Sequence, residues 1–238
     1  IKNKLLSYQA EHVVHLVHSL KTHSRVLDAS DTGTGKTYSA IAACIVLGYI
    51  PFIVCPKSVI SSWINVLKFF DANYYGITNY ESLQNCKYFT AVSNGKTICP
   101  YITRTVVKNE KKEKKSDTEY TYTWQNIPEN MVIIFDEAHR CKNPKTLNSV
   151  ILYTLAKHTV KIMMLSATLS DKPENFALAG FVLGLYKNVK DSTRWMERVG
   201  KGHNNVMMGV HGVLYDEYAC RMRIRDLGKL FPDNQVIA

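Results

Sequence analysis

Ten residues close to the N-terminus have the composition of a phosphate-binding loop. Residues 28–37 read Asp-Ala-Ser-Asp-Thr-Gly-Thr-Gly-Lys-Thr. Without Cβ atoms at Gly33 and Gly35, backbone N–H groups can converge on an anion. Lys36 can reach the β- and γ-phosphates of a nucleotide, and the hydroxyl of Thr37 can ligate Mg²⁺. The segment therefore predicts nucleotide chemistry.

The surroundings of this loop support the prediction, although one position departs from the strict pattern. Arg25 and the apolar residues Val26 and Leu27 precede the loop, and apolar residues at helical spacing follow it. A strand before the loop and a helix after it are the context that phosphate binding requires, because the helix directs its positive end at the anion. The strict pattern has glycine six residues before Lys36, where this chain has Ser30. A glycine-rich turn before a helix is the alternative interpretation.

A pair of acidic residues follows the clearest buried strand in the sequence. Residues 131–135 are continuously apolar, and Asp136 and Glu137 come directly after them. An aspartate in this position can hold Mg²⁺, and the glutamate beside it can polarise a water molecule that attacks the γ-phosphate. The alternative is the capped start of a helix, but Pro144 makes a long helix there unfavourable.

Alternating strands and helices must bring these residues together. Short apolar runs predict buried strands at 52–55, 131–135 and 160–165, and residues 74–81 predict a strand followed by a loop. Helices are predicted at 5–20, 58–70, 146–157, 173–186, 191–199 and 213–222. This alternation predicts an α/β fold with a parallel sheet in three layers. Because parallel strands end at one edge of a sheet, residues 28–37, 56–58, 136–137 and 166–168 should meet there.

Residues 94–130 differ from the rest of the chain and predict an insertion. Two stretches rich in β-forming residues, 101–107 and 118–124, lie on either side of a Lys/Glu run at 108–115. Two such strands joined by a charged tip predict an antiparallel hairpin that projects from the domain.

Composition limits the partners and the compartment. The 238 residues have a formal charge of +10 and a pI near 9.2, which favours a polyanionic partner, either nucleic acid or a membrane surface. The sequence has no apolar run long enough for a membrane-spanning helix. Six cysteines without a Cys-x-x-Cys pair are typical of reduced thiols, so we expect an intracellular protein of the nucleus, the cytoplasm or a viral compartment.

Three histidines lie three residues apart on the first predicted helix. His12, His15 and His18 would follow one side of that helix. A metal-binding stripe needs further acidic or cysteine ligands at suitable spacing, and none follow. We therefore interpret the stripe as a partly exposed polar face.

Taken together, the motifs resemble those of superfamily 2 helicases and translocases. Gly-Thr-Gly-Lys-Thr, Asp-Glu-Ala-His and Ser-Ala-Thr occur in the order of that superfamily. Further stretches resemble its Swi/Snf branch: Tyr8-Gln9, 54–63, 77–81, 136–144, 221–226 and 230–232. Two stretches, 32–37 and 168–172, depart from the Swi/Snf form toward the wider superfamily. The resemblance covers nearly the whole chain except the insertion.

The resemblance implies a fold and a role for individual residues. Residues 1–238 would form an N-terminal RecA-like lobe of the P-loop NTPase class, with an inserted β-hairpin and a helical segment at 171–226. ATP and Mg²⁺ would be held by Gln9, Thr32, Gly33, Thr34, Gly35, Lys36, Thr37 and Asp136, with Glu137 as general base and with Lys36 and Asp136 also catalytic. His139, Ser166 and Thr168 would couple the nucleotide to nucleic-acid binding. Contacts with nucleic acid would come from Lys57, Ser58, Trp63, Asn79, Tyr80, Lys142 and Asn143. For Trp63, packing in the core is an equally good interpretation, because it lies in an apolar helical stripe.

The implied activity is ATP hydrolysis coupled to movement along nucleic acid, with double-stranded DNA as the favoured track. An RNA helicase or a transcription-release factor is the alternative. A binding module with a vestigial ATPase would have lost Lys36 or Glu137, and both are present. The family completes its ATP site with arginines from a second RecA-like lobe, which these residues do not include. Because a missing arginine finger costs roughly 10³–10⁵ in rate, we expect this lobe alone to be nearly inactive. The many Lys, Asn, Ile and Tyr residues suit the AT-rich genome of a large DNA virus.

Overall fold

A six-stranded parallel sheet forms the centre of the chain. The structure is a computed structural model that describes residues 1–107, 119–215 and 217–230. The strands lie in the order β10-β1-β9-β8-β2-β3, and every neighbouring pair is parallel. Their bounds are β1 (Arg25–Asp28), β2 (Ile50–Cys55), β3 (Gly76–Asn79), β8 (Met131–Asp136), β9 (Lys161–Leu165) and β10 (Ala219–Cys220). The predicted parallel sheet is confirmed.

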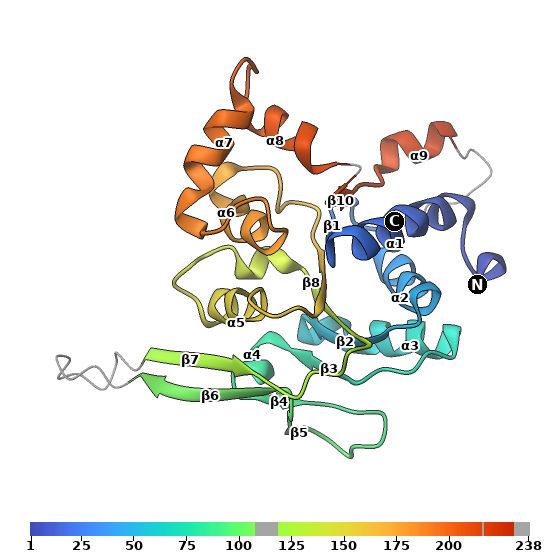
Figure 1. Cartoon of the computed structure of the whole chain (residues 1–238). Helices are drawn as coiled ribbons and strands as arrows, with labels where there is room; N and C mark the ends of the chain where they lie inside the picture. Colours follow the sequence, from blue (N-terminus) through green and yellow to red (C-terminus); the bar gives the residue numbers. More distant parts are fainter. Residues whose placement is uncertain (108–118, 216, 231–238) are drawn as a thin grey trace.

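Helices cover both faces of the sheet and make three layers (Figure 1). Successive side chains of β8 point to opposite faces, so Ile133 and Phe135 enter one core while Val132 and Ile134 enter the other. Burial on both faces explains why this strand is continuously apolar. One face carries α1 (Ser7–His23), α2 (Lys36–Leu47) and α3 (Ile60–Phe70). The other carries α5 (Leu147–Leu155), α6 (Pro173–Val182), α7 (Ser192–Gly200) and α8 (Val206–Leu214).

The predicted hairpin is present and extends away from the body of the chain (Figure 1). It consists of β6 (Ile102–Val107) and β7 (Glu119–Trp124), which pair antiparallel. The buried indole of Trp124 anchors its base by donating a hydrogen bond to the carbonyl of Ile151 on α5, at 3.1 Å. The predicted charged tip at 108–115 lies outside the described residues.

A second, smaller strand pair in this region was not predicted. It is formed by β4 (Lys87–Tyr88) and β5 (Thr97–Ile98), which run antiparallel beside the edge strand β3. The short helix α4 (Tyr80–Leu83) connects β3 to it.

The predicted helix at 213–222 is wrong. Helix α8 ends at Leu214, and the chain then forms β10 before the last helix, α9 (Ile224–Leu230). The segment forms a strand and not a helix because the backbone groups on the outer edge of β1 need hydrogen-bond partners. Leu27 N–H donates to the carbonyl of Tyr218 at 2.9 Å, and Ala29 N–H to that of Cys220 at 2.8 Å. The other helix predictions in this segment are confirmed, although α6 ends before Gly184, which has a φ of 81°.

Two predictions from composition can be compared with the described residues. All six cysteines are free. Among the helices of the described ranges, none combines the length and the apolar composition needed to cross a bilayer.

Candidate functional site

The glycine-rich loop between β1 and α2 has the shape that an anion-binding loop needs. Gly33 and Gly35 have φ angles of 85° and 82°, a region that side chains with a Cβ rarely adopt. A Cβ added to Gly35 would also lie 2.2 Å from Nε2 of Gln9. Gly35 caps the start of α2, so the N–H groups of the first helical turn point toward the loop. Both the backbone angle and the close approach of α1 require glycine here.

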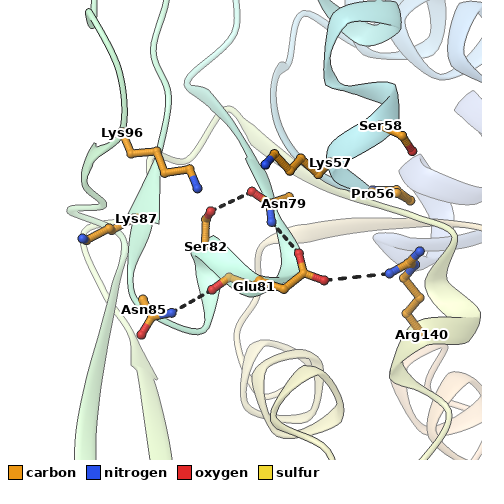
Figure 2. A pocket seen from close by; sticks show the side chains of 10 residues that line it. All are labelled: Pro56, Lys57, Ser58, Asn79, Glu81, Ser82, Asn85, Lys87, Lys96 and Arg140. Atoms are coloured by element: carbon orange, nitrogen blue, oxygen red, sulfur yellow. Dashed lines mark hydrogen bonds and ion pairs between the residues drawn. The ribbon is translucent and has the colours of Figure 1, made fainter.

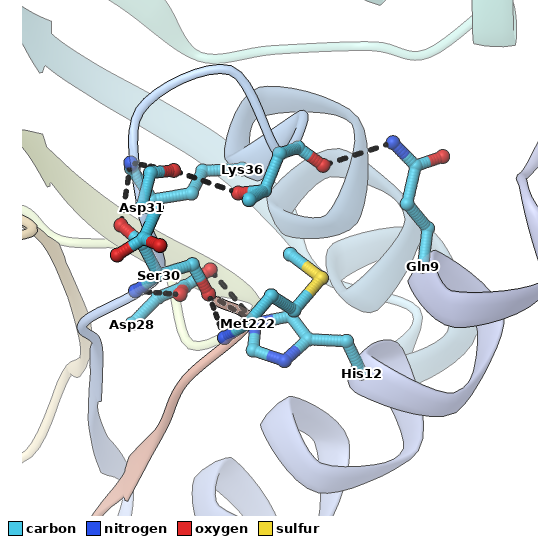
Figure 3. Close-up of polar contacts among 8 residues, drawn as sticks. Gln9, His12, Asp28, Ser30, Asp31, Lys36 and Met222 are labelled. Carbon is cyan, nitrogen blue, oxygen red and sulfur yellow. Dashed lines mark hydrogen bonds and ion pairs between the residues drawn. The ribbon is translucent and has the colours of Figure 1, made fainter. Parts of the chain in front are cut away.

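Gln9 joins α1 to this loop. Its Nε2 donates to the carbonyl of Thr34 at 3.2 Å, and its Oε1 accepts from Leu6 N–H at 3.1 Å. Figure 3 shows the amide next to the loop. Together they border a cavity of about 460 Å³ that is lined by Leu6, Tyr8, Gln9, Thr32, Gly33, Gly35, Lys36, Thr37, Tyr38, Asp136 and Glu137. The side chain of Thr34 points back into the loop, where its hydroxyl donates to the carbonyl of Asp31 at 2.8 Å.

Lys36 and Asp136 face the same cavity from different elements. The ammonium of Lys36 donates to the carbonyls of Ser30 (2.8 Å) and Asp31 (3.0 Å), which hold it at the mouth of the loop. Burial raises the pKa of Asp136, and the negative charge of Glu137 adds to that effect. The positive charge of Lys36 and a hydrogen bond from Trp63 act in the opposite direction on this pKa. A cation in the cavity would therefore be attracted by a carboxylate that is poorly solvated.

Ser30, the departure from the strict loop pattern, connects the loop to the C-terminal segment. Its hydroxyl accepts from Met222 N–H at 2.8 Å. Asp31 extends this contact, because its N–H donates to the carbonyl of Met222 at 2.9 Å and its carboxylate accepts from Ile224 N–H at 3.0 Å. The backbone of Ser30 does not have a positive φ, so glycine is not required there. A glycine at this position would lack the hydroxyl that makes the contact.

His12 is buried below the loop, and the prediction of a partly exposed polar face is wrong for this residue. Its Nε2 lies 2.9 Å from Oδ2 of Asp28 at the end of β1, with side-chain exposures of 5% and 0%. Burial alone would raise the pKa of Asp28, but the charge of His12 and the hydrogen bonds from His12 and Ser30 lower it. His15 and His18 are exposed as predicted. The pair stabilises the base of the loop (Figure 3).

Trp63 and Tyr80 support Asp136 from the interior, so the prediction that they contact nucleic acid directly is wrong. Both side chains are buried, at 0% and 2% exposure. The indole N–H of Trp63 donates to Oδ2 of Asp136 at 2.8 Å, and the hydroxyl of Tyr80 donates to the backbone carbonyl of Asp136 at 2.7 Å. Glu137 N–H donates to the second carboxylate oxygen of Asp136 at 3.0 Å. These contacts fix the orientation of the carboxylate.

We predict that Trp63→Phe destabilises the fold in a pH-dependent manner. The indole hydrogen bond favours the ionised form of Asp136, so its loss should raise the pKa of Asp136 further. A hydrogen bond to a charged group contributes about 1.5–3 kcal/mol. The full destabilisation applies above the pKa that Asp136 has in the folded variant. It decreases as the pH falls through this pKa, because a protonated carboxyl group gains less from the indole donor. Urea unfolding at neutral and at acidic pH measures the cost.

Trp124→Phe is the matched control for this prediction. The indole of Trp124 is equally buried but donates to the neutral carbonyl of Ile151. Its removal should cost the same free energy of unfolding at both pH values. If the two variants depend on pH in the same way, the hydrogen bond from Trp63 does not influence the ionisation of Asp136.

Glu137, His139 and Ser166 form a contact chain from the acidic pair to the end of β9. Oε2 of Glu137 lies 3.1 Å from Nδ1 of His139, and the hydroxyl of Ser166 lies 3.4 Å from the same nitrogen. Glu137 has a φ of 53° and a ψ of 48°, a left-handed conformation that is strained for a residue with a side chain. Thr168 is exposed, and the structure does not bring its side chain into this chain of contacts.

A second cavity lies beyond β8, at the same edge of the sheet (Figure 2). It has a volume of about 950 Å³ and is lined by Pro56, Lys57, Ser58, Asn79, Glu81, Ser82, Asn85, Lys87, Lys96 and Arg140. Three of the residues predicted to contact nucleic acid, Lys57, Ser58 and Asn79, are therefore together. Lys142 and Asn143 are exposed but do not line this cavity. The sequence patterns did not point to Lys87, Lys96 or Arg140. Of these three residues, only Arg140 lies within a motif, the extended acidic motif at 136–144.

Comparisons with known proteins agree with this architecture. A family model described as "Type III restriction enzyme, res subunit" matches residues 2–171. A protein of Acanthamoeba polyphaga mimivirus, which its name describes provisionally as an ATP-dependent RNA helicase, is 36% identical over 98% of this chain. The SWI2/SNF2 ATPase core of Sulfolobus solfataricus, solved in complex with double-stranded DNA, aligns with a TM-score of 0.62 over 98% of the chain at 16% identity. The chain spans 46% of the length of each of these two relatives.

The extent of these matches is enough to assign the family. The family model covers well over half of the chain, and the viral relative is similar along almost all of it. The structural neighbour shares the fold of the parallel sheet and its helices. The chain therefore belongs to the family described as the type III restriction enzyme res subunit, and it is an N-terminal RecA-like lobe of a superfamily 2 helicase.

Proposed function

We propose that this chain is the ATP-binding lobe of a motor that hydrolyses ATP to move along nucleic acid. One observation carries the proposal. Lys36 and Thr37 from the start of α2, Asp136 and Glu137 from the end of β8, and Gln9 from α1 line one cavity. These residues are up to 128 positions apart in the chain, and a phosphate loop opposite two carboxylates is the arrangement that phosphoryl transfer to water needs.

The residues of this cavity fit ATP and Mg²⁺. The loop that Gly33 and Gly35 form supplies backbone donors for phosphates, and a Cβ at Gly35 would collide with Gln9. Oxygen ligands suit Mg²⁺, and Thr37 and Asp136 offer a hydroxyl and a carboxylate on one cavity. When bound, Mg²⁺ offsets the charge that develops on the phosphate oxygens. Gln9 borders the same cavity from α1, next to the loop, and we assign its amide to recognition of the adenine edge.

Glu137 is the residue that fits the role of general base. It lines the cavity and is partly exposed, so its carboxylate can accept a proton from a water molecule. His139 holds the carboxylate from the other side, and Ser166 holds His139. A proton or a charge on Glu137 therefore influences the end of β9. This contact chain is a route by which hydrolysis could be coupled to movement.

A second RecA-like lobe would complete the ATP site. Among the residues that line the cavity, which all lie in the described part of the chain, no arginine is present. The charge of the transferred phosphate group would then be balanced by Lys36 alone on the protein side. Because an arginine finger contributes roughly 10³–10⁵ in rate, the lobe alone should hydrolyse ATP very slowly.

Double-stranded DNA is the proposed track, and RNA is the second candidate. The Swi/Snf-like motifs and the fold that the chain shares with a DNA-bound ATPase core support DNA. The name of the viral relative, which is the more similar in sequence, supports RNA. The basic cavity next to the acidic motif can hold phosphates of either polymer, because phosphate contacts carry no sequence information. Stimulation of ATP hydrolysis in the full-length protein by duplex DNA, single-stranded DNA or RNA distinguishes the two.

We predict that Lys36→Ala weakens binding of a fluorescent ATP analogue by about 10- to 100-fold in the presence of Mg²⁺. The estimate corresponds to the loss of about 1.5–3 kcal/mol from one charged hydrogen bond. Titration of the 238-residue chain measures this affinity without depending on hydrolysis.

Lys57→Ala is the control for this experiment. It removes the same charge and a similar side chain, but it lines the other cavity, so nucleotide affinity should not change. Equal affinities of the wild-type chain and Lys36→Ala, or no binding by the wild-type chain, would contradict the proposed ATP site.

A further inference from the structure

The strand pair β4–β5 forms one wall of the basic cavity beside the acidic motif. Lys87 begins β4, and Lys96 directly precedes β5, where the register pairs Lys87 with Ile98. Figure 2 shows both lysines on this wall: the side chain of Lys96 extends toward Lys57, and that of Lys87 lies at the outer margin of the cavity with its ammonium directed away from Lys57. The other walls come from the ends of β2 and β3 and from the segment after β8. The sequence predicts Lys96 to lie in an insertion, 94–130, that projects from the domain.

Backbone contacts attach this wall to the sheet. Phe89 and Ile77 exchange two backbone hydrogen bonds of 2.8 and 2.9 Å, which join the segment to β3. The hydroxyl of Thr78 donates to the carbonyl of Lys87 at 2.7 Å. These contacts fix the backbone of β4 relative to β3, and β5 is attached through its pairing with β4.

Packing of Tyr88 adds a side-chain anchor. Its ring is buried against Phe52 of β2, with ring centroids 6.0 Å apart. The ring also occupies the space where a Cβ of Gly76 would stand, since the distance would be only 2.3 Å. Gly76 therefore allows the strand pair to pack closely against β3. The wall is a built part of the sheet edge.

The charges of the cavity are unbalanced. Glu81 is the acidic residue among the lining side chains, and it accepts a hydrogen bond from Asn79 and lies 4.0 Å from Arg140. Its own backbone N–H and the amide of Asn79 lower the pKa of Glu81, with smaller effects from Arg140 and Lys57, so it remains ionised. In the ranges that the structure describes, no carboxylate lies within ion-pair distance of Lys57, Lys87 or Lys96. Three exposed ammonium groups therefore border the cavity without an ion-pair partner among the described residues, and that of Lys96 lies 5.8 Å from the ring centroid of Phe89.

We propose that the β4–β5 wall binds the phosphate backbone of a nucleic-acid strand through Lys87 and Lys96. The inference rests on the proposed function, and it extends the track from the motif residues onto a segment that lies between the motifs. A strand seated against Lys57 and Arg140 would meet Lys96 across the cavity and Lys87 at its outer margin. The phosphate backbone of the strand would then contact basic residues on more than one wall of the cavity.

The lining residues favour phosphate contacts over base recognition. None of the described residues that line the cavity is aromatic, so the cavity has no platform on which a base could stack. The polar groups of Asn79, Ser82 and Asn85 already bond within the protein. Lys57, Lys87 and Lys96 remain without an ion-pair partner among the described residues, and ammonium groups suit phosphate oxygens.

The salt dependence of binding tests this proposal. Labelled single-stranded and duplex oligonucleotides are titrated with the 238-residue chain between about 50 and 200 mM salt. Each lost phosphate contact lowers the slope of log K against log salt by about 0.7 for a single strand and about 0.9 for a duplex. For Lys87→Gln/Lys96→Gln, which removes two contacts, we expect the magnitude of the slope to fall by about 1.4 with a single strand and by about 1.8 with a duplex. The affinity for the ATP analogue should not change.

Two further variants make the outcomes distinguishable. Lys187→Gln/Lys190→Gln removes the same charge from exposed positions between α6 and α7 that do not line the basic cavity, and its slope should equal that of the wild type. If Lys57→Gln lowers the slope while Lys87→Gln/Lys96→Gln does not, the wall does not contact phosphates, although the proposed function stands. If all variants bind as the wild type does, or polyglutamate competes as well as nucleic acid, both the wall and the nucleic-acid track are overturned.

Discussion

His12→Ala should destabilise the chain by about 3–5 kcal/mol at neutral pH, the cost of leaving a buried carboxylate without its partner. Asp28 is fully buried, and His12 is the group that lies 2.9 Å from its Oδ2. Without His12, the pKa of Asp28 should rise, since burial then acts with less opposition. The cost should therefore be largest at neutral pH and should shrink as the pH falls through this raised pKa. Urea unfolding across this pH range measures it.

The double variant His12→Ala/Asp28→Asn separates charge from packing. A neutral amide at position 28 does not need a cation, so the double variant should be more stable than His12→Ala alone. His15→Ala, on the exposed side of the same helix, should change the free energy of unfolding little. If His12→Ala is as stable as His15→Ala, the pair contributes nothing to the base of the loop.

Glu137→Gln should lower ATP hydrolysis by about 10²–10⁴-fold in the full-length protein, the range that a general base contributes. The prediction rests on the proposed function. The amide keeps the size of the side chain but cannot accept the proton, and Asp136, Lys36 and the glycine loop are unchanged. Affinity for the ATP analogue should therefore remain that of the wild type. Single-turnover hydrolysis in the presence of nucleic acid measures the chemical step.

Glu129→Gln is the control for this variant, since Glu129 is exposed and lies before β8. It should hydrolyse ATP at the wild-type rate. If Glu137→Gln retains this rate, another group activates the water. If it also loses nucleotide affinity, the side chain helps to form the binding site itself.

The central sheet was predictable because its strands carry their signal locally. β8 is apolar at every position from Met131 to Phe135, and burial on both faces demands such a run. The glycine loop and the acidic pair have local signals of the same kind. Once the strands are known to be parallel, their carboxyl ends must share one edge, which places Lys36 and Asp136 around one cavity.

Other features depend on partners that are far apart in the sequence. The apolar stripe of α3 predicted that Trp63 could be buried, but its hydrogen-bond partner Asp136 is 73 residues away. β10 has two residues and exists because the edge of β1 needs partners, so its own sequence resembled a helix. Lys87 begins one strand and Lys96 directly precedes the other in a strand pair that is too short to produce a periodic pattern. In these cases, tertiary contacts decide what local propensity does not.

The joining of Ser30 to Met222 has a consequence for synthesis on the ribosome. The two residues are 192 positions apart, so at about 5–20 residues per second roughly 10–40 s pass between their translation. During this interval the glycine loop has been made, but the N–H groups of Met222 and Ile224, which donate to the Ser30 hydroxyl and the Asp31 carboxylate, have not. A nascent chain should therefore capture triphosphate only after translation has passed these residues. Nucleotide capture would then report that the lobe has been completed.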